Sequence, residues 1–196
     1  MKSFILYMKM KKGIICIETE WQVTSRSSRR DMDTNSMLRF LHEVHQIPFI
    51  YRRVATEGEL SYYLKEFGKS EYQKKYSIMY FSFHGNTHTI RLEGDNKELT
   101  LTDLASIGGA VFSDRLVHFS SCKTLLKSDS MVNQFKEETG AKLVSGYSKS
   151  VDTMMSAILD LGLFDAFFTY KQIPAIIRRI KSLYGGLSQE LGFTIY

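Results

Sequence analysis

The chain has 196 residues, of which 43% are hydrophobic and 13% aromatic, so it is long and apolar enough to bury one substantial core. Its formal net charge of +5 arises from 26 basic and 21 acidic residues that are spread along the chain, which argues against a dedicated nucleic-acid surface. Two cysteines, Cys16 and Cys122, are too few for a disulfide framework and favour the reducing cytoplasm.

The sequence contains no good candidate for a membrane span. Its longest apolar stretch, residues 151–170, includes Asp152, Asp160 and Asp165 and is typical of a buried or interfacial helix. We therefore predict a single domain over residues 1–196, with residues 1–12 as an N-terminal extension and no membrane partner.

Strands and helices alternate along the chain. Apolar runs predict strands over residues 13–17, 77–83 and 116–119, and the first of these runs is typical of a strand covered on both faces. Residues 48–54 and 141–145 are also expected to form strands. Helical spacing and turn residues predict helices over residues 33–46, 56–67, 102–107, 129–138, 151–170 and 173–184. The second of these helices opens with a capping box formed by Thr56 and Glu59.

Two further segments complete the predicted fold. Residues 89–101 alternate apolar and polar around Gly94, which predicts a β-hairpin, and residues 192–196 are expected to form a last strand. The order of elements predicts an α/β fold: a mainly parallel sheet with helices on both faces and a small β-hairpin insertion.

Two reactive side chains, His84 and Cys122, each follow an apolar strand of the predicted sheet. Active sites of open α/β sheets lie at the carboxyl ends of strands. If these two strands are neighbours, as consecutive strands usually are, their ends lie about 4.8 Å apart and the imidazole can meet the thiol. Because a free cysteine is mostly protonated at neutral pH, an adjacent histidine is needed to take its proton.

Gly85 completes the predicted catalytic group. Because it has no side chain, its backbone amide can approach a scissile carbonyl, and together with the amide of Cys122 it can bind the developing oxyanion. The predicted roles are nucleophile for Cys122, base and then acid for His84, and oxyanion binding for Gly85 and Cys122.

Two blocks of the sequence resemble the catalytic blocks of clan CD cysteine peptidases, which include caspases, metacaspases, separases and bacterial CHAT-domain proteases. One is the apolar run that ends in His84 and Gly85, and the other covers residues 116–122 and ends in a small residue and Cys122. Residues 140–152 and 191–193 are similar to the CHAT subgroup in particular. The resemblance implies a caspase-like three-layer sandwich and a cysteine endopeptidase that uses a His–Cys dyad without an obligatory third acidic residue.

The resemblance also implies properties beyond the dyad. It implies a protein or peptide substrate, a regulatory partner protein or ligand, and a role in bacterial defence or signalling. Caspase relatives can pair through the last strand of the sheet, so residues 192–196 are a candidate homodimer interface. Since Ser120 and Ser121 precede Cys122, where caspases have Gln-Ala-Cys, the caspase preference for aspartate is not expected here.

Three acidic residues, Glu18, Glu20 and Asp152, lie near the carboxyl ends of predicted strands. In the caspase-like fold, loops at these positions wall the pocket for the residue before the cut. Glu20 or Asp152 can therefore select a basic side chain through a charge-assisted hydrogen bond. A solvated loop acid, or for Asp152 a place in the first helical turn, is the alternative.

Other interpretations of the same residues stay open. With His84 as a structural strand-end histidine and Cys122 as an inert thiol, the chain would be a catalytically inactive caspase-like binding or scaffolding module. Acyl transfer, or hydrolysis of a small amide, is a third hypothesis. His88 suggests a metal site with Cys122, but the chain lacks the paired spacings typical of zinc ligands, so we expect neither a metal nor another cofactor. His118 is expected to be a packing residue.

Overall fold

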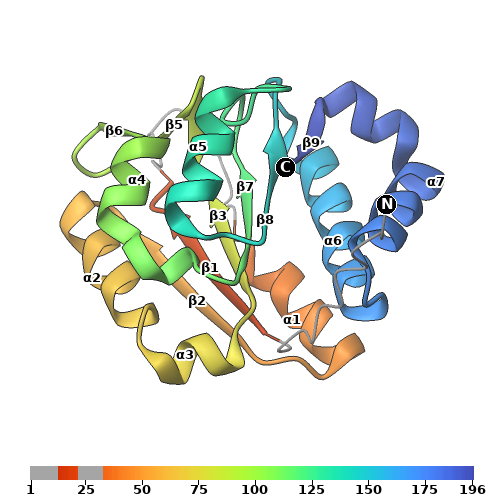
Figure 1. Cartoon of the computed structure of the whole chain (residues 1–196), viewed down its shortest axis with the longest axis horizontal. Helices are drawn as coiled ribbons and strands as arrows, with labels where there is room; N and C mark the ends of the chain where they lie inside the picture. Colours follow the sequence, from red (N-terminus) through yellow and green to blue (C-terminus); the bar gives the residue numbers. More distant parts are fainter. Residues whose placement is uncertain (1–12, 22–32) are drawn as a thin grey trace, which may run out of the picture.

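A computed structural model describes residues 13–21 and 33–196 of the chain, and the predicted extension over residues 1–12 lies outside the described residues. The described part is built around a six-stranded sheet in the order β2-β1-β3-β7-β8-β9 (Figure 1). Neighbouring strands of this sheet run parallel, except that β9 is antiparallel to β8. The strands are β1 (Ile14–Thr19), β2 (Phe49–Val54), β3 (Ile78–Ser82), β7 (Leu116–Ser120), β8 (Leu143–Tyr147) and β9 (Phe193–Ile195).

Helices cover both faces of this sheet (Figure 1). One face carries α2 (Glu57–Phe67), α3 (Ser70–Lys75), α4 (Leu101–Gly108), the 3-10 helix η1 (Gly109–Phe112) and α5 (Ser130–Thr139). The other carries α1 (Asn35–His45), α6 (Thr153–Thr169) and α7 (Ile173–Leu191). The predicted α/β architecture with a mainly parallel sheet is confirmed. Within residues 13–21 and 33–196, no helix is both long enough and apolar enough to cross a lipid bilayer.

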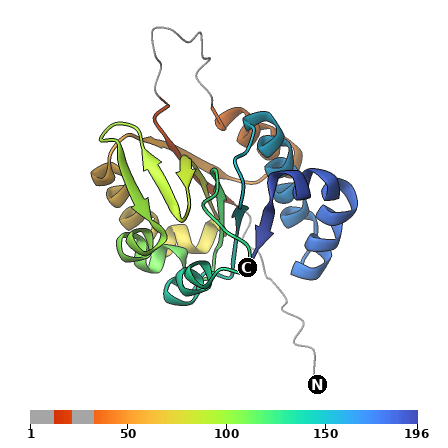
Figure 2. The ribbon, with the colours of Figure 1, turned by 90° about the horizontal axis from the view of Figure 1, so that it is seen from above.

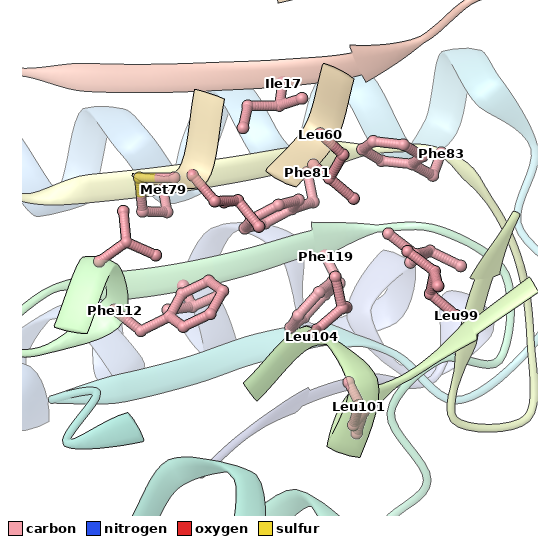
Figure 3. Packing of buried hydrophobic residues seen from close by; sticks show 14 of the residues in the cluster. Ile17, Leu60, Met79, Phe81, Phe83, Leu99, Leu101, Leu104, Phe112 and Phe119 are labelled. Atoms are coloured by element: carbon pink, nitrogen blue, oxygen red, sulfur yellow. The ribbon is translucent and has the colours of Figure 1, made fainter. Parts of the chain in front are cut away.

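Each face of the sheet has its own hydrophobic core, because successive side chains of a strand point to opposite faces. Ile15 and Ile17 pack in the core beneath α2, α4 and α5, whereas Ile14 and Cys16 pack in the core beneath α1, α6 and α7. Figure 3 shows the first of these cores, with Phe81 among its labelled side chains. The continuous apolar runs of the sequence therefore reflect burial on both faces.

A small antiparallel sheet follows β3 in the chain. It consists of β4 (His84–Asn86), β5 (Thr89–Leu92) and β6 (Lys97–Thr100), so the predicted hairpin is present and β4 adds an unpredicted third strand. Figure 2 shows the yellow-green hairpin on the opposite side of the main sheet from α6 and α7 (blue). Buried Ile90, Leu92 and Leu99 belong to the same core as Phe81, which fixes the segment that carries His84 to the main sheet.

The other predicted boundaries agree with the structure within two residues, but α3 was not predicted and α7 runs further than expected. The helix predicted to end at Tyr184 continues to Leu191, with a kink at Tyr184, where φ is −124° and ψ is 21°. Leu191 is buried and Leu187 packs against the second core. Tertiary packing therefore outweighs the low helix propensity of Gly185 and Gly186.

A buried polar network links the main sheet to α6. His118 contacts Asp160 Oδ1 through Nε2 at 2.7 Å and Ser145 Oγ through Nδ1 at 2.8 Å, and the hydroxyls of Tyr80 and Tyr147 donate to the Asp160 carboxylate. Burial acts to raise the pKa of Asp160, but the charge and hydrogen bond of His118 bring it below the ordinary value. Ser145, His118 and Asp160 form a hydrogen-bonded chain like that of a serine hydrolase. All three are fully buried, however, and cannot contact a substrate. His118 is buried as predicted, and besides its polar partners its ring contacts the rings of Phe164 and Phe193.

Candidate functional site

His84 and Cys122 lie at the same edge of the main sheet, beyond the carboxyl ends of two adjacent strands. β3 and β7 are parallel neighbours, and their register pairs Ser82 with Ser120. His84 and Cys122 each follow two positions after one of these serines. The expectation that the two strands are neighbours is confirmed, and the register brings the two residues to matching positions.

Gly85 is the point of contact between the two segments. A Cβ atom at Gly85 would stand 2.7 Å from the carbonyl oxygen of Cys122, 2.5 Å from Thr124 Oγ1 and 2.9 Å from Ser121 Cβ. A side chain here would overlap its neighbours, so only glycine fits without a shift of the backbone. The segment after β3 and the loop after β7 are therefore packed directly against each other.

Backbone hydrogen bonds hold the loop that carries Cys122. The N–H of Lys123, which has φ +56°, donates to the carbonyl of Lys149 at 3.0 Å. The N–H of Leu125 donates to the carbonyl of Tyr147 at 3.2 Å. The loop is thus tied to the end of β8 and to the segment that leads into α6.

The Cys122 thiol is half-buried and faces the backbone of Val151. The Val151 N–H donates to Sγ at 3.4 Å, and Sγ lies 4.0 Å from the Val151 carbonyl oxygen. An N–H donor suits a sulfur atom that carries negative charge at the moment of attack. The segment just before α6 therefore forms one wall around the sulfur.

The His84 ring is 45% exposed and contacts two side chains from other elements. The Trp21 indole meets it edge to face, with 4.7 Å between ring centroids. His84 Nε2 lies 3.7 Å from Oε1 of Glu93, whose side chain is only 4% exposed and accepts two hydrogen bonds from Arg91, at 2.8 and 3.1 Å. The imidazole therefore lies beside a buried, ion-paired carboxylate.

Neither Trp21 nor Glu93 was among the predicted site residues. Glu93 comes near His84 because β4 and β5 pair His84 with Arg91, and the residue two positions after Arg91 lies on the same face. Since β4 was not predicted, this register could not be used at the level of sequence. Trp21 follows β1 and meets His84 only through the tertiary arrangement of the strands.

The two predicted substrate-binding acids already have partners in the fold. Asp152 is the N-cap of α6, and its Oδ1 accepts the N–H groups of Met154 and Met155 at 2.9 and 3.0 Å. Glu20 is half-exposed and forms an ion pair with Arg53 at 3.3 Å. Both remain near the site, since Asp152 directly follows the residue that contacts Cys122 and Glu20 directly precedes Trp21.

Glu18, the third acidic candidate, is buried beside the ends of β2 and β3. Its carboxylate accepts hydrogen bonds from the hydroxyls of Tyr51 and Ser82, the latter at 3.2 Å, and the Arg53 guanidinium lies 3.9 Å away. Burial raises the pKa of Glu18, and the hydrogen bonds from Tyr51 and Ser82 oppose this rise. Because it is enclosed by these partners, Glu18 has a structural role near the carboxyl end of β1.

The part of the chain that the structure describes contains no group of three or more histidine, cysteine, aspartate or glutamate side chains placed to hold a metal ion. His88, which suggested a metal site, pairs instead with Asp129, and Nε2 and Oδ2 are 2.5 Å apart. Burial acts to raise the pKa of Asp129, but the hydrogen bonds from His88 and from the Met131 N–H bring it below its usual value. The contact ties the turn before β5 to the start of α5.

Comparison with known proteins identifies the family of the chain. Residues 11–196 match a protein family described as a family of unknown function (DUF6642). The chain belongs to the DUF6642 family. None of the curated proteins searched matches the sequence.

The description of DUF6642 names no activity, whereas the site in this DUF6642 chain has a definite chemical character. A half-buried thiol, a half-exposed imidazole and a buried carboxylate gather at one edge of the sheet. A thiol and an imidazole are the groups that acyl-transfer chemistry with a cysteine nucleophile requires, and a carboxylate can orient the imidazole.

Proposed function

We propose that the chain is a cysteine endopeptidase of the caspase-like kind, closest to bacterial CHAT-domain proteases, which cleaves a protein or peptide through His84 and Cys122. The observation that carries the proposal is the β3–β7 register, which pairs Ser82 with Ser120 two residues before the dyad. The contact between Gly85 and the Cys122 loop supports it. The helices on both faces and the hairpin between the two dyad strands agree with a caspase-like sandwich.

In the proposed reaction, His84 takes the proton of Cys122 and the sulfur attacks the carbonyl carbon of the substrate peptide bond. The backbone N–H groups of Gly85 and Cys122 stabilise the oxyanion of the tetrahedral intermediate. His84 then donates the proton to the leaving amine as the C–N bond breaks, which leaves a thioester on Cys122. Water, deprotonated by His84, attacks the thioester, releases the acid product and restores the thiol.

Glu20 and Asp152 give the proposed enzyme a preference for a basic residue before the cut. Both carboxylates belong to segments that adjoin the dyad, through Trp21 beside His84 and through Val151 beside Cys122. The capping bonds of Asp152 use Oδ1, so Oδ2 remains for a ligand. A lysine or arginine side chain at this place would gain a charge-assisted hydrogen bond.

The proposed setting is the cytoplasm, with regulation by a partner protein and a role in bacterial defence or signalling. β9 lies at one edge of the main sheet, so its outer backbone groups can pair with a second copy in a homodimer.

The proposal is tested with a peptide library made from a bacterial proteome, in which new N-termini are labelled and identified by mass spectrometry. We expect cleavage by the wild-type chain, none above background by Cys122→Ala, and a loss of about 10²–10⁴-fold in kcat for His84→Ala. His42→Ala, at an exposed position of α1, is the matched histidine control and should cleave normally. The same new termini with Cys122→Ala would overturn the mechanism. An inactive wild-type chain would favour the binding module, and turnover of small amides alone would favour the third hypothesis.

A further inference from the structure

Glu93 has an uncommon position for a carboxylate. It is almost fully buried, although it lies in the turn between β5 and β6, where side chains are usually solvated. A buried charge is costly unless it is paired, and Arg91 supplies two hydrogen bonds to Oε1. A second ionisable side chain within reach of Oε1 is His84, whose Nε2 lies 3.7 Å away.

The turn that carries Glu93 is held firmly. The N–H of Gly94 donates to the carbonyl of Ala55 at 2.9 Å, and a Cβ at Gly94 would stand 2.7 Å from the same oxygen. The N–H of Glu57 donates to Asp95 Oδ2 at 3.1 Å. On the other side, Leu92 is buried in the core. The position of the carboxylate is therefore set by contacts on both sides of Glu93.

We propose that Glu93 is a positioning residue for His84, an inference that rests on the proposed peptidase function. The carboxylate orients the ring so that Nε2 faces Glu93, which leaves Nδ1 to exchange the proton with Cys122. When the thiol proton moves to Nδ1, the imidazolium donates its Nε2–H to Glu93, and the proton on Nδ1 then passes to the leaving amine. Glu93 remains ionised throughout, so the step needs no further proton donor or acceptor.

Charged and titratable groups near His84 come from several elements. Arg91 and Glu93 belong to β5 and the turn after it, and Cys122 belongs to the loop after β7. Glu18 and Glu20 lie at the end of β1, just before Trp21. The negative charge of Glu93 favours the protonated form of His84, whereas the positive charge of Arg91 disfavours it. Removing one or the other charge should therefore shift the titration of His84 in opposite directions.

The test compares Glu93→Gln with Glu98→Gln, a matched control on β6 that is exposed and pairs in register with Arg91. An NMR titration of the His84 ring should show a midpoint at lower pH in Glu93→Gln and no change in Glu98→Gln. With a library-derived peptide, kcat should fall at least about tenfold in Glu93→Gln with little change in KM.

A second variant, Arg91→Gln, keeps the Glu93 carboxylate and removes the guanidinium that competes with His84 for it. The midpoint of the His84 titration should therefore move to higher pH. An unchanged midpoint in both variants would overturn the inference, and so would a normal kcat in Glu93→Gln. The NMR titration of His84 does not require the chain to cleave a peptide. Failure of the proposed function, seen as an inactive wild-type chain, is therefore distinguishable from failure of the pairing between Glu93 and His84.

Discussion

The carbonyl oxygen of Cys122 lies 2.7 Å from the point where a Cβ atom would stand at Gly85. This distance is shorter than any ordinary contact between such atoms, so the backbone after β3 approaches the loop after β7 as closely as a glycine allows. The contact gives Gly85 a steric reason to be glycine in addition to its proposed role as an oxyanion donor.

Gly85→Ala is therefore expected to destabilise the fold by about 1–3 kcal/mol through overpacking and to lower the proposed peptidase activity by moving the Cys122 loop. Gly58→Ala is the matched control, because Gly58 lies in α2 and, apart from its chain neighbours and the backbone of its own helix, no heavy atom lies within 4 Å of its Cβ position. That control should keep activity and gain up to about 1 kcal/mol. Urea unfolding and peptide cleavage measure both effects, and equal stability of the two variants would refute the steric argument.

Asp160→Asn should cost about 3–5 kcal/mol at neutral pH, because it breaks a fully buried pair and leaves His118 without its carboxylate. Asp165→Asn, on the same helix, removes a half-exposed partner of His45 and should cost less than about 1 kcal/mol. Urea unfolding at pH 7 compares the two. A cost for Asp160→Asn no greater than that for Asp165→Asn would show that the buried network contributes little.

Asp160 also contributes a pH dependence. Its pKa is lowered from 3.8 in the folded chain, because His118 and hydrogen bonds outweigh burial. Its contribution to stability is therefore fully present above about pH 4 and is lost as pH falls through the folded pKa.

Glu18 is expected to act with the opposite sign. Burial raises the pKa of Glu18 from 4.5 in the folded chain. Its contribution to the stability of the fold is therefore fully present below about pH 4.5 and is lost as pH rises through the folded pKa. Glu18→Gln should remove this loss, whereas Glu20→Gln, which changes a half-exposed acid two residues later, should leave the pH profile of stability unchanged. Thermal melting between pH 4 and pH 8 measures the difference, and parallel profiles for wild type and Glu18→Gln would contradict the assignment.

The sequence was most informative where one local rule determines the structure. The capping box of Thr56 and Glu59 is present, with Glu59 Oε2 accepting the N–H of Thr56 at 3.1 Å. The apolar runs are strands because both faces of the sheet are covered. By contrast, the end of α7 depends on the burial of Leu191, which cannot be predicted from helix propensity.

The candidate site shows the same division. The neighbouring positions of His84 and Cys122 could be expected from strand order. The contact of Trp21 with His84 and the pairing of Glu93 with Arg91 could not, because they depend on hairpin register and on how β1 ends. Asp152 could be interpreted either as a ligand or as a helix cap, and the cap accounts for its observed hydrogen bonds.

The proposed substrate preference depends on the charges of Asp152 and Glu20 beside the proposed site. Asp152→Asn keeps a good N-cap residue and removes only the charge, so the helix should remain intact while kcat/KM for peptides with lysine or arginine before the cut falls about tenfold. Glu20→Gln should act in the same direction. Peptides with a neutral residue at that place are the control and should be cleaved equally well. An unchanged preference in both variants would exclude these acids as the source of selectivity.

The most direct test of the dyad is the rate at which iodoacetamide alkylates Cys122 as a function of pH, in wild type and in His84→Ala. Mass spectrometry locates the label, and Cys16, which is fully buried, serves as an internal control. With His84 holding the thiol proton, Cys122 in the wild type should react rapidly below neutral pH, and His84→Ala should lose this reactivity. Identical pH profiles in the two proteins would contradict a catalytic pairing of His84 with Cys122.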